Sequence, residues 1–193
     1  MKIGTKSVLF GAHCFLIHPI FVFVAWTKLY GFPFDPRLWI AFFIHDLGYW
    51  GKPNMDGPEG EEHVLFGAKV MHFLFDKEES KKWYNFSLYH SRFYARRDKT
   101  SPSKLCYADK LAVTLEPCWL YLLRTNASKE VYEYMKLAES KYDFMKLPRD
   151  NQEKWFYAMT EYLRLYVMEH KDGKIDDWTG EVKTAIDSNG VYK

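Results

Sequence analysis

The chain of 193 residues is rich in apolar and aromatic side chains, which make up 48% and 19% of it. This composition excludes an intrinsically disordered protein, and the length suffices for one domain with a sizeable core. The formal net charge is only +2, so an anionic ligand would need a local cluster of cations, and a nucleic-acid partner is not expected. The three cysteines, Cys14, Cys106 and Cys118, follow no CxxC spacing and are expected to be reduced thiols of a cytoplasmic protein.

The first helices are expected in the nearly continuous apolar stretch 8–26. This stretch contains His13, His18 and Pro19 and lacks a signal-peptide cleavage region, so it predicts a pair of buried helices and no membrane span. Pro19 suits the first position of a helix that Gly31 ends.

The next helix, 37–47, is apolar on nearly every side and is therefore expected to be central and buried. Asp35 is its candidate N-cap and Gly48 ends it. The Gly-, Pro- and Asp-rich residues 51–60 predict a loop.

Further helices are expected over about 61–75, 78–90 and 102–115, with a polar and basic stretch at 94–101 between the last two. Amphipathic helices then follow at about 128–146 and 150–170, before a polar tail after Gly173. Because no β alternation or internal repeat is visible, we predict an all-α fold with one domain over 1–193.

His45 and Asp46 are adjacent in the apolar helix 37–47. Burying a carboxylate without a partner is costly, so a hydrogen bond between the two side chains or a metal ion must compensate. Asp109 favours the metal, because it is the only acidic residue on the otherwise apolar helix face formed by residues 105, 108, 109 and 112. Two carboxylates that point into one core repel each other unless a cation lies between them.

His18, His63 and His90 also stand at the ends of predicted helices, from which side chains can converge on one cavity. Each could instead be an ordinary polar histidine. Gly67, four residues after His63, would leave room for a ligand beside it.

The ordered set His…His-Asp…His…His…Asp resembles the ligand pattern of dinuclear HD-superfamily proteins. The strings Ile44-His45-Asp46-Leu47-Gly48, His63-Val-Leu-Phe-Gly67-Ala68, Tyr89-His90-Ser91 and Ala108-Asp109-Lys110 are similar to motifs of bacterial diadenosine tetraphosphate hydrolases of that superfamily. The resemblance covers about 13–116, which would be the motif-bearing core of a single HD-type helical domain. The helices at about 128–170 resemble no family that we can name.

The resemblance implies a metal-dependent phosphohydrolase that cleaves a phosphoester or phosphoanhydride of a nucleotide through a metal-bound hydroxide. It implies two divalent ions, with mixed nitrogen and oxygen ligands that suit iron, manganese, cobalt or zinc. The implied metal ligands are His18, His45, Asp46, His63, His90 and Asp109. Either His18 or His13 could be the first ligand; we favour His18 and assign His13 to substrate contact.

A phosphate substrate also requires cations. The candidates that could surround the pocket are Arg92, Arg96, Arg97 and Lys104, with Arg92 the strongest because it follows His90 closely. Lys52 and Glu62 are the candidate catalytic side chains beside Asp46, with Glu59 and Glu61 as alternatives to Glu62. In HDLGYWGK, however, the lysine lies further from the HD pair than in the usual HDxGK.

Two other functions share this ligand pattern. A di-iron HD-type oxygenase would cleave a C–C or C–P bond, and a non-catalytic HD module would sense a nucleotide. The expected partner is a small-molecule phosphate, with no membrane, and assembly into a homo-oligomer is left open.

Overall fold

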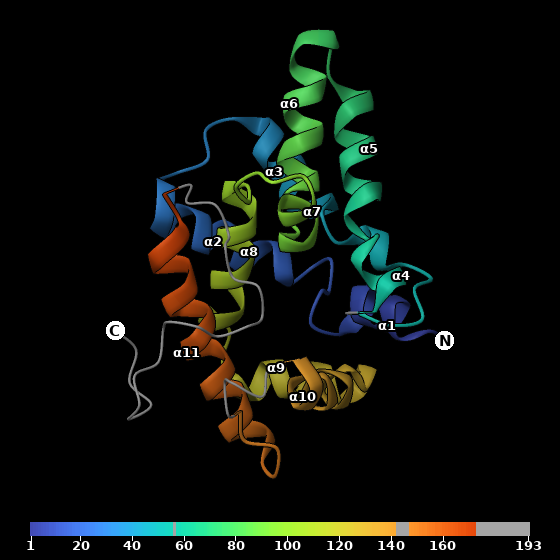
Figure 1. Cartoon of the computed structure of the whole chain (residues 1–193), viewed down its shortest axis with the longest axis vertical. Coiled ribbons are helices and arrows are strands. Elements are labelled where there is room, and N and C mark those ends of the chain that lie inside the picture. The colour runs from blue at the N-terminus through green and yellow to red at the C-terminus, as the bar shows by residue number, and fades with distance from the viewer. Residues whose placement is uncertain (56, 142–146, 173–193) are drawn as a thin grey trace.

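The computed structural model describes residues 1–55, 57–141 and 147–172, and all regular secondary structure in these ranges is helical (Figure 1). The prediction of an all-α fold is therefore confirmed. The helices, in chain order, are α1 (Ile3–Phe10), α2 (His18–Tyr30), α3 (Pro36–Ile44), the 3₁₀ turn η1 (Leu47–Tyr49), α4 (Pro58–Glu61), α5 (Val64–Leu74), α6 (Lys77–Leu88), α7 (Arg92–Arg97), α8 (Lys104–Leu115), α9 (Cys118–Ser128), α10 (Glu130–Lys141) and α11 (Gln152–His170). The predicted tail after Gly173 and the end of the predicted helix 128–146 lie outside the described residues.

The apolar N-terminal stretch is divided between α1 and α2, and a non-helical turn that contains His13 joins them. Pro19 occupies the first turn of α2, as predicted, and Gly31 ends the helix with a positive φ of 85°. In the part of the chain that the structure describes, no helix is both long and apolar enough to cross a membrane.

Helix α3 begins after Asp35, whose side chain accepts a hydrogen bond of 2.9 Å from the backbone N–H of Arg37. The helix ends at Ile44, three residues earlier than predicted, and η1 follows. The backbone of His63 lies against η1, where a Cβ on Gly48 would come within 1.9 Å of the His63 carbonyl oxygen, so this turn needs glycine. This turn presents His45 and Asp46 at the end of α3.

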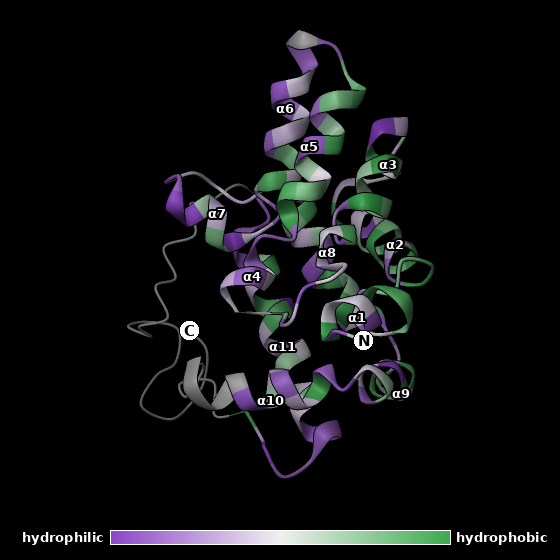
Figure 2. Ribbon diagram, turned by 90° about the vertical axis from the view of Figure 1, so that its right-hand side faces the viewer, coloured by the Kyte–Doolittle hydropathy of each residue, from purple (hydrophilic) through white to green (hydrophobic). Residues whose placement is uncertain are grey.

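Helix α8 lies at the centre, with α2 packed against one side and α11 against another (Figure 1). The small buried residues Ala108 and Ala112 on α8 and Ala25 on α2 allow the helices to approach closely. In Figure 2 the middle of α2, residues 20–25, is hydrophobic, as expected of a helix packed in the core. Asp109 is therefore held on the central, closely packed helix of the core.

Helices α5 and α6 form an antiparallel pair that extends from the rest of the molecule (Figure 1). The inner ends of this pair carry His63, immediately before α5, and His90, shortly after α6. Three helices were not predicted: the short α4 and α7, and α9, which begins directly after Pro117. Because proline is also favoured at helix starts, Pro117 ends α8 and opens α9 within a few residues.

Candidate metal centre

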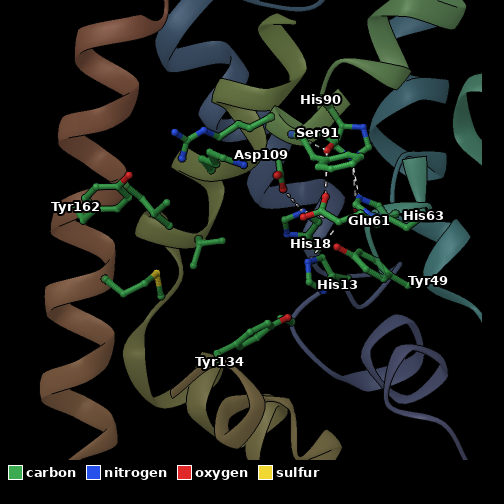
Figure 3. Close-up of a pocket in the computed structure, with 18 of the residues that line it drawn as sticks. His13, His18, Tyr49, Glu61, His63, His90, Ser91, Asp109, Tyr134 and Tyr162 are labelled. Carbon is green, nitrogen blue, oxygen red and sulfur yellow. Dashed lines mark hydrogen bonds and ion pairs between the residues drawn. The ribbon is translucent and has the colours of Figure 1, made fainter. Parts of the chain in front are cut away.

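Six histidine and aspartate side chains converge from five separate segments of the chain. His18 begins α2, His45 and Asp46 follow α3, and Asp109 lies within α8. His63 and His90 come from the inner ends of the α5–α6 pair. Figure 3 shows His18, His63, His90 and Asp109 directed toward one region of a pocket.

The six side chains form two groups whose candidate ligand atoms lie within 4.8 Å of one another. The first group contains His18, His45, Asp46 and Asp109, and the second contains Asp46, His63 and His90. Asp46 belongs to both, because its two carboxylate oxygens face opposite ways.

The distances show that each oxygen of the Asp46 carboxylate faces a different group. Its Oδ2 atom lies 3.0 Å from His45 Nε2 and 3.4 Å from His18 Nε2. Its Oδ1 atom lies 3.6 Å from His63 Nε2 and 3.5 Å from His90 Nε2. Asp109 Oδ1 completes the first group at 2.9 Å from His18 Nε2. One carboxylate can thus serve two neighbouring cation positions.

Three of the histidines are held in the same way by the backbone. The Nδ1 atoms of His45, His63 and His90 lie 2.9, 2.7 and 2.6 Å from the carbonyl oxygen three residues earlier. Because a carbonyl oxygen can only accept, Nδ1 carries the proton in each ring, and in the neutral ring Nε2 keeps its lone pair. This tautomer is the one that a metal ligand requires.

The second group contains a direct conflict between lone pairs. His63 Nε2 and His90 Nε2 are 3.2 Å apart and both are buried. Tyr49 stacks on the His63 ring with centroids 3.9 Å apart and planes 8° from parallel, which fixes the ring against rotation. Burial, aided by the neighbouring His90, lowers the pKa of His63 to about 3. A cation between the two nitrogens would remove the conflict.

The first group is strongly polarised. Burial alone disfavours a charged His45, but the carboxylates of Asp46 and Asp109 outweigh it and raise its pKa to about 10. Burial would likewise raise the pKa of Asp46, yet His45 and His13 hold it well below its usual range. The pKa of Asp109 is also lowered despite burial, through its 2.9 Å hydrogen bond with His18 and the nearby His45 ring. Two neighbouring carboxylates, of which Asp46 is buried and Asp109 is 18% exposed, are thus kept ionised side by side, which favours a cation between them.

Two buried atoms of this cluster, His45 Nε2 and Asp46 Oδ2, have no hydrogen-bond partner. Buried polar atoms are almost always satisfied in folded proteins, so these two atoms call for a partner that the neighbouring side chains do not supply. Both atoms belong to the first group and both are metal-ligand types. The residues present therefore fit a divalent cation.

His13 lies beside the first group without joining it. Its Nε2 atom is 4.0 Å from Asp46 Oδ2, whereas its Nδ1 atom makes a 2.8 Å hydrogen bond with Ser7 Oγ. The structure thus places His18 in the first group and His13 at the wall of the adjoining cavity.

The cavity next to the cluster has a volume of about 290 Å³. Arg92 and Arg96, at the start and near the end of α7, both line it. The Arg92 guanidinium also lies 4.0 Å from the centre of the Tyr166 ring, which supports it from behind. Arg92 and Arg96 were both predicted from the sequence to bind a phosphate, and both lie at the cavity.

The structure does not bring the other four predicted side chains to the cavity. Lys52 donates a 2.9 Å hydrogen bond to Glu62, and the Glu62 side chain is 56% exposed. Arg97 pairs with Asp98 at 2.7 Å, and the exposed Lys104 lies over the Tyr30 ring at 4.9 Å. These side chains are close to the His/Asp motifs in the sequence, but they point to other partners.

Several residues that line the cavity were not singled out. Glu61 lines it in place of Glu62, and Ser91 Oγ donates a 3.3 Å hydrogen bond to Glu61. Lys110, next to Asp109, adds a third cation to the lining. The sequence signal that could have indicated Lys110 is its position directly after the inward-facing Asp109.

Comparisons with protein-family models, with curated proteins and with solved structures found no match to this chain. The fold and the site therefore define the class by themselves: an all-helical protein with a buried cluster of histidines and aspartates that could hold metal ions.

Proposed function

We propose that this chain is a metal-dependent phosphohydrolase of the HD superfamily, with two divalent ions in the His/Asp cluster. The observation that carries the proposal is the division of Asp46, whose two oxygens each serve one group of ligands. Divalent ions bound in this way supply Lewis acidity and lower the pKa of a coordinated water. A nucleotide is the substrate class that the sequence resemblance favours.

The protein side chains around the cluster suit a phosphate ester. Arg92, Arg96 and Lys110 add positive charge to the cavity lining, where it would attract and orient an anionic group. Glu61 lies in the same lining, close to Ser91, and could hold a proton for the leaving group. His13 faces Asp46 from the other side and could contact a bound substrate.

The test begins with protein reconstituted without oxygen, separately with Fe²⁺, Mn²⁺, Co²⁺ and Zn²⁺. Phosphate release is then measured on nucleoside mono- and polyphosphates, dinucleoside polyphosphates and simple phosphomonoesters. Release in the absence of oxygen supports hydrolysis and eliminates the di-iron oxygenase. Oxygen uptake with a carbon or phosphonate substrate, and no anaerobic release, would overturn the proposal. Nucleotide binding without turnover under any metal would instead favour the sensing module.

A matched pair of variants tests the assignment of the site. Asp109→Ala removes a carboxylate of the first group and is expected to abolish phosphate release. Asp172→Ala removes a carboxylate whose side chain is 78% exposed and pairs only with Lys171 among the described contacts, so activity should be unchanged. Activity that persists in Asp109→Ala would refute the assignment.

A further inference from the structure

The cavity beside the cluster has two chemically different sides. One side carries the histidines, aspartates and cations already described. The opposite side is built by Val113 of α8, by residues of α9 to α11 and by Leu147, and none of these lining residues is acidic or basic. We call this side the C-terminal wall; it consists of Val113, Tyr121, Tyr134, Leu147, Trp155, Met159, Tyr162 and Leu163.

The C-terminal wall is firmly supported from behind. Tyr121, Leu147 and Trp155 are buried members of one hydrophobic cluster, in which Tyr134 and Met159 also pack. The rings of Tyr134 and Trp155 are within 6° of parallel with centroids 6.4 Å apart, and Tyr121 lies 6.5 Å from Trp155. Figure 3 shows Tyr134 and Tyr162 on sides of the pocket away from His63. The wall is therefore a packed surface that faces the cluster across the cavity.

We infer that the C-terminal wall binds an aromatic group that is attached to the phosphate. This inference rests on the proposed function for the position of the phosphate, since the cations and the His/Asp cluster fix the anionic end. The wall carries no charged side chain to pair with a phosphate, and its aromatic rings offer apolar faces, so it favours the uncharged part of a ligand.

Two observations favour an aromatic group over a long alkyl chain. Four of the eight wall residues, Tyr121, Tyr134, Trp155 and Tyr162, are aromatic, and such side chains stack on planar ligands. The volume of about 290 Å³ is also at the lower end for small-molecule sites, and the polar side of the cavity takes part of it. A compact planar group suits a space of this size better than a long chain does. A nucleobase and a simple aryl group share this chemistry.

Binding of phosphonates, which contain no hydrolysable ester, tests the inference independently of catalysis. Phenylphosphonate, n-butylphosphonate and methylphosphonate are titrated calorimetrically under argon into Mn²⁺-loaded protein and into chelator-treated protein. Burial of the ring predicts that phenylphosphonate binds at least about tenfold more tightly than methylphosphonate. It should also bind more tightly than n-butylphosphonate, whose apolar area is similar. Equal affinities of phenyl- and methylphosphonate, or tighter binding of the butyl compound, would overturn the inference.

Two methionines of α11 provide a matched pair of variants. Met159 lines the cavity, whereas Met168 lies further along the same helix and is 50% exposed. Met159→Ala is expected to reduce the preference for phenyl- over methylphosphonate by about tenfold, while Met168→Ala leaves it unchanged. An unchanged preference in Met159→Ala, with helicity retained by circular dichroism, would contradict the assignment of the wall.

Competition experiments identify the source of the aromatic group. Displacement of phenylphosphonate by adenine indicates a nucleobase, and its absence with phenylphosphonate still bound indicates a simple aryl phosphate. Both results support the inference. If phosphate release fails for every substrate but phenylphosphonate is still preferred, the proposed hydrolase is refuted and the C-terminal wall is not.

Discussion

The replacement of Asp46 by asparagine distinguishes two linked metal sites from one. Asparagine keeps the shape of the side chain but removes its charge and turns one oxygen into an amide nitrogen, which cannot bind a metal. Because each Asp46 oxygen faces a different group, Asp46→Asn is expected to empty both. Asp109→Asn should empty only the first group, and His90→Ala only the second.

The size of the effect follows from the contacts. Four histidine Nε2 atoms lie between 3.0 and 3.6 Å from the two Asp46 oxygens, and the Asp46 side chain is only 9% exposed. Loss of a partner that merely orients a metal ligand weakens metal binding by about 10–100-fold. Loss of a shared, charged ligand should therefore weaken both positions by more than about 100-fold.

The assay is the metal content per chain, measured by mass spectrometry after reconstitution with Mn²⁺ and desalting. Two ions are expected in the unmodified protein, none in Asp46→Asn and one in each of the other two variants. Asp172→Asn is the control and should retain two. Two ions retained by Asp46→Asn, with its helicity intact, would refute the shared carboxylate.

Three further predictions concern the packing and charge around the cluster. Gly48→Ala should lose the ion of the second group, because its new Cβ would lie 1.9 Å from the His63 carbonyl oxygen. Gly31→Ala has no neighbour within 4 Å and should keep both ions, at a cost of about 1–3 kcal/mol for its positive φ. In chelator-treated protein, the pKa of His45 is raised from 6.5 to about 10, so the stability from its proton is complete below pH 6.5 and is lost as the pH rises toward 10; the melting temperature should fall over this range, and a flat profile would contradict the assignment. Arg124→Met leaves the Glu116 carboxylate, 3% exposed, without its partner and should lower stability by about 3–5 kcal/mol, or about 6–20 °C in melting temperature, while adding Glu116→Gln should restore most of it.

Much of the helical framework could be predicted because its signals are local. Pro19 and Gly31 mark the ends of α2, and the Asp35 cap marks the start of α3, through backbone effects within a turn of the residue itself. Helix α9 was missed because Pro117 was interpreted only as the end of α8. One proline cannot indicate how soon the chain becomes helical again.

The convergence of the six His/Asp side chains could also be predicted from the sequence, since acidic residues on apolar helix faces point toward a core. The direction of side chains in loops could not be predicted in this way. Lys52 and Glu62 follow the motifs closely but bind each other, and Glu61, one residue earlier, lines the cavity. Gly67 was expected to leave room for a ligand. In the structure, a Cβ there would lie 3.2 Å from His45 Cα, so its small size allows α5 to pack against the end of α3.

The residues after the motif-bearing stretch also hold the turn that carries His13. Arg124, on α9, donates a hydrogen bond to the Gly11 carbonyl oxygen. Glu130, fully buried at the start of α10, accepts a 2.5 Å hydrogen bond from the Ala12 N–H. Its other oxygen lies 3.9 Å from His13 Nδ1. The side of Asp46 that faces His13 thus depends on α9 and α10, which no motif marks, because a buried polar turn needs fixed partners from a distant segment.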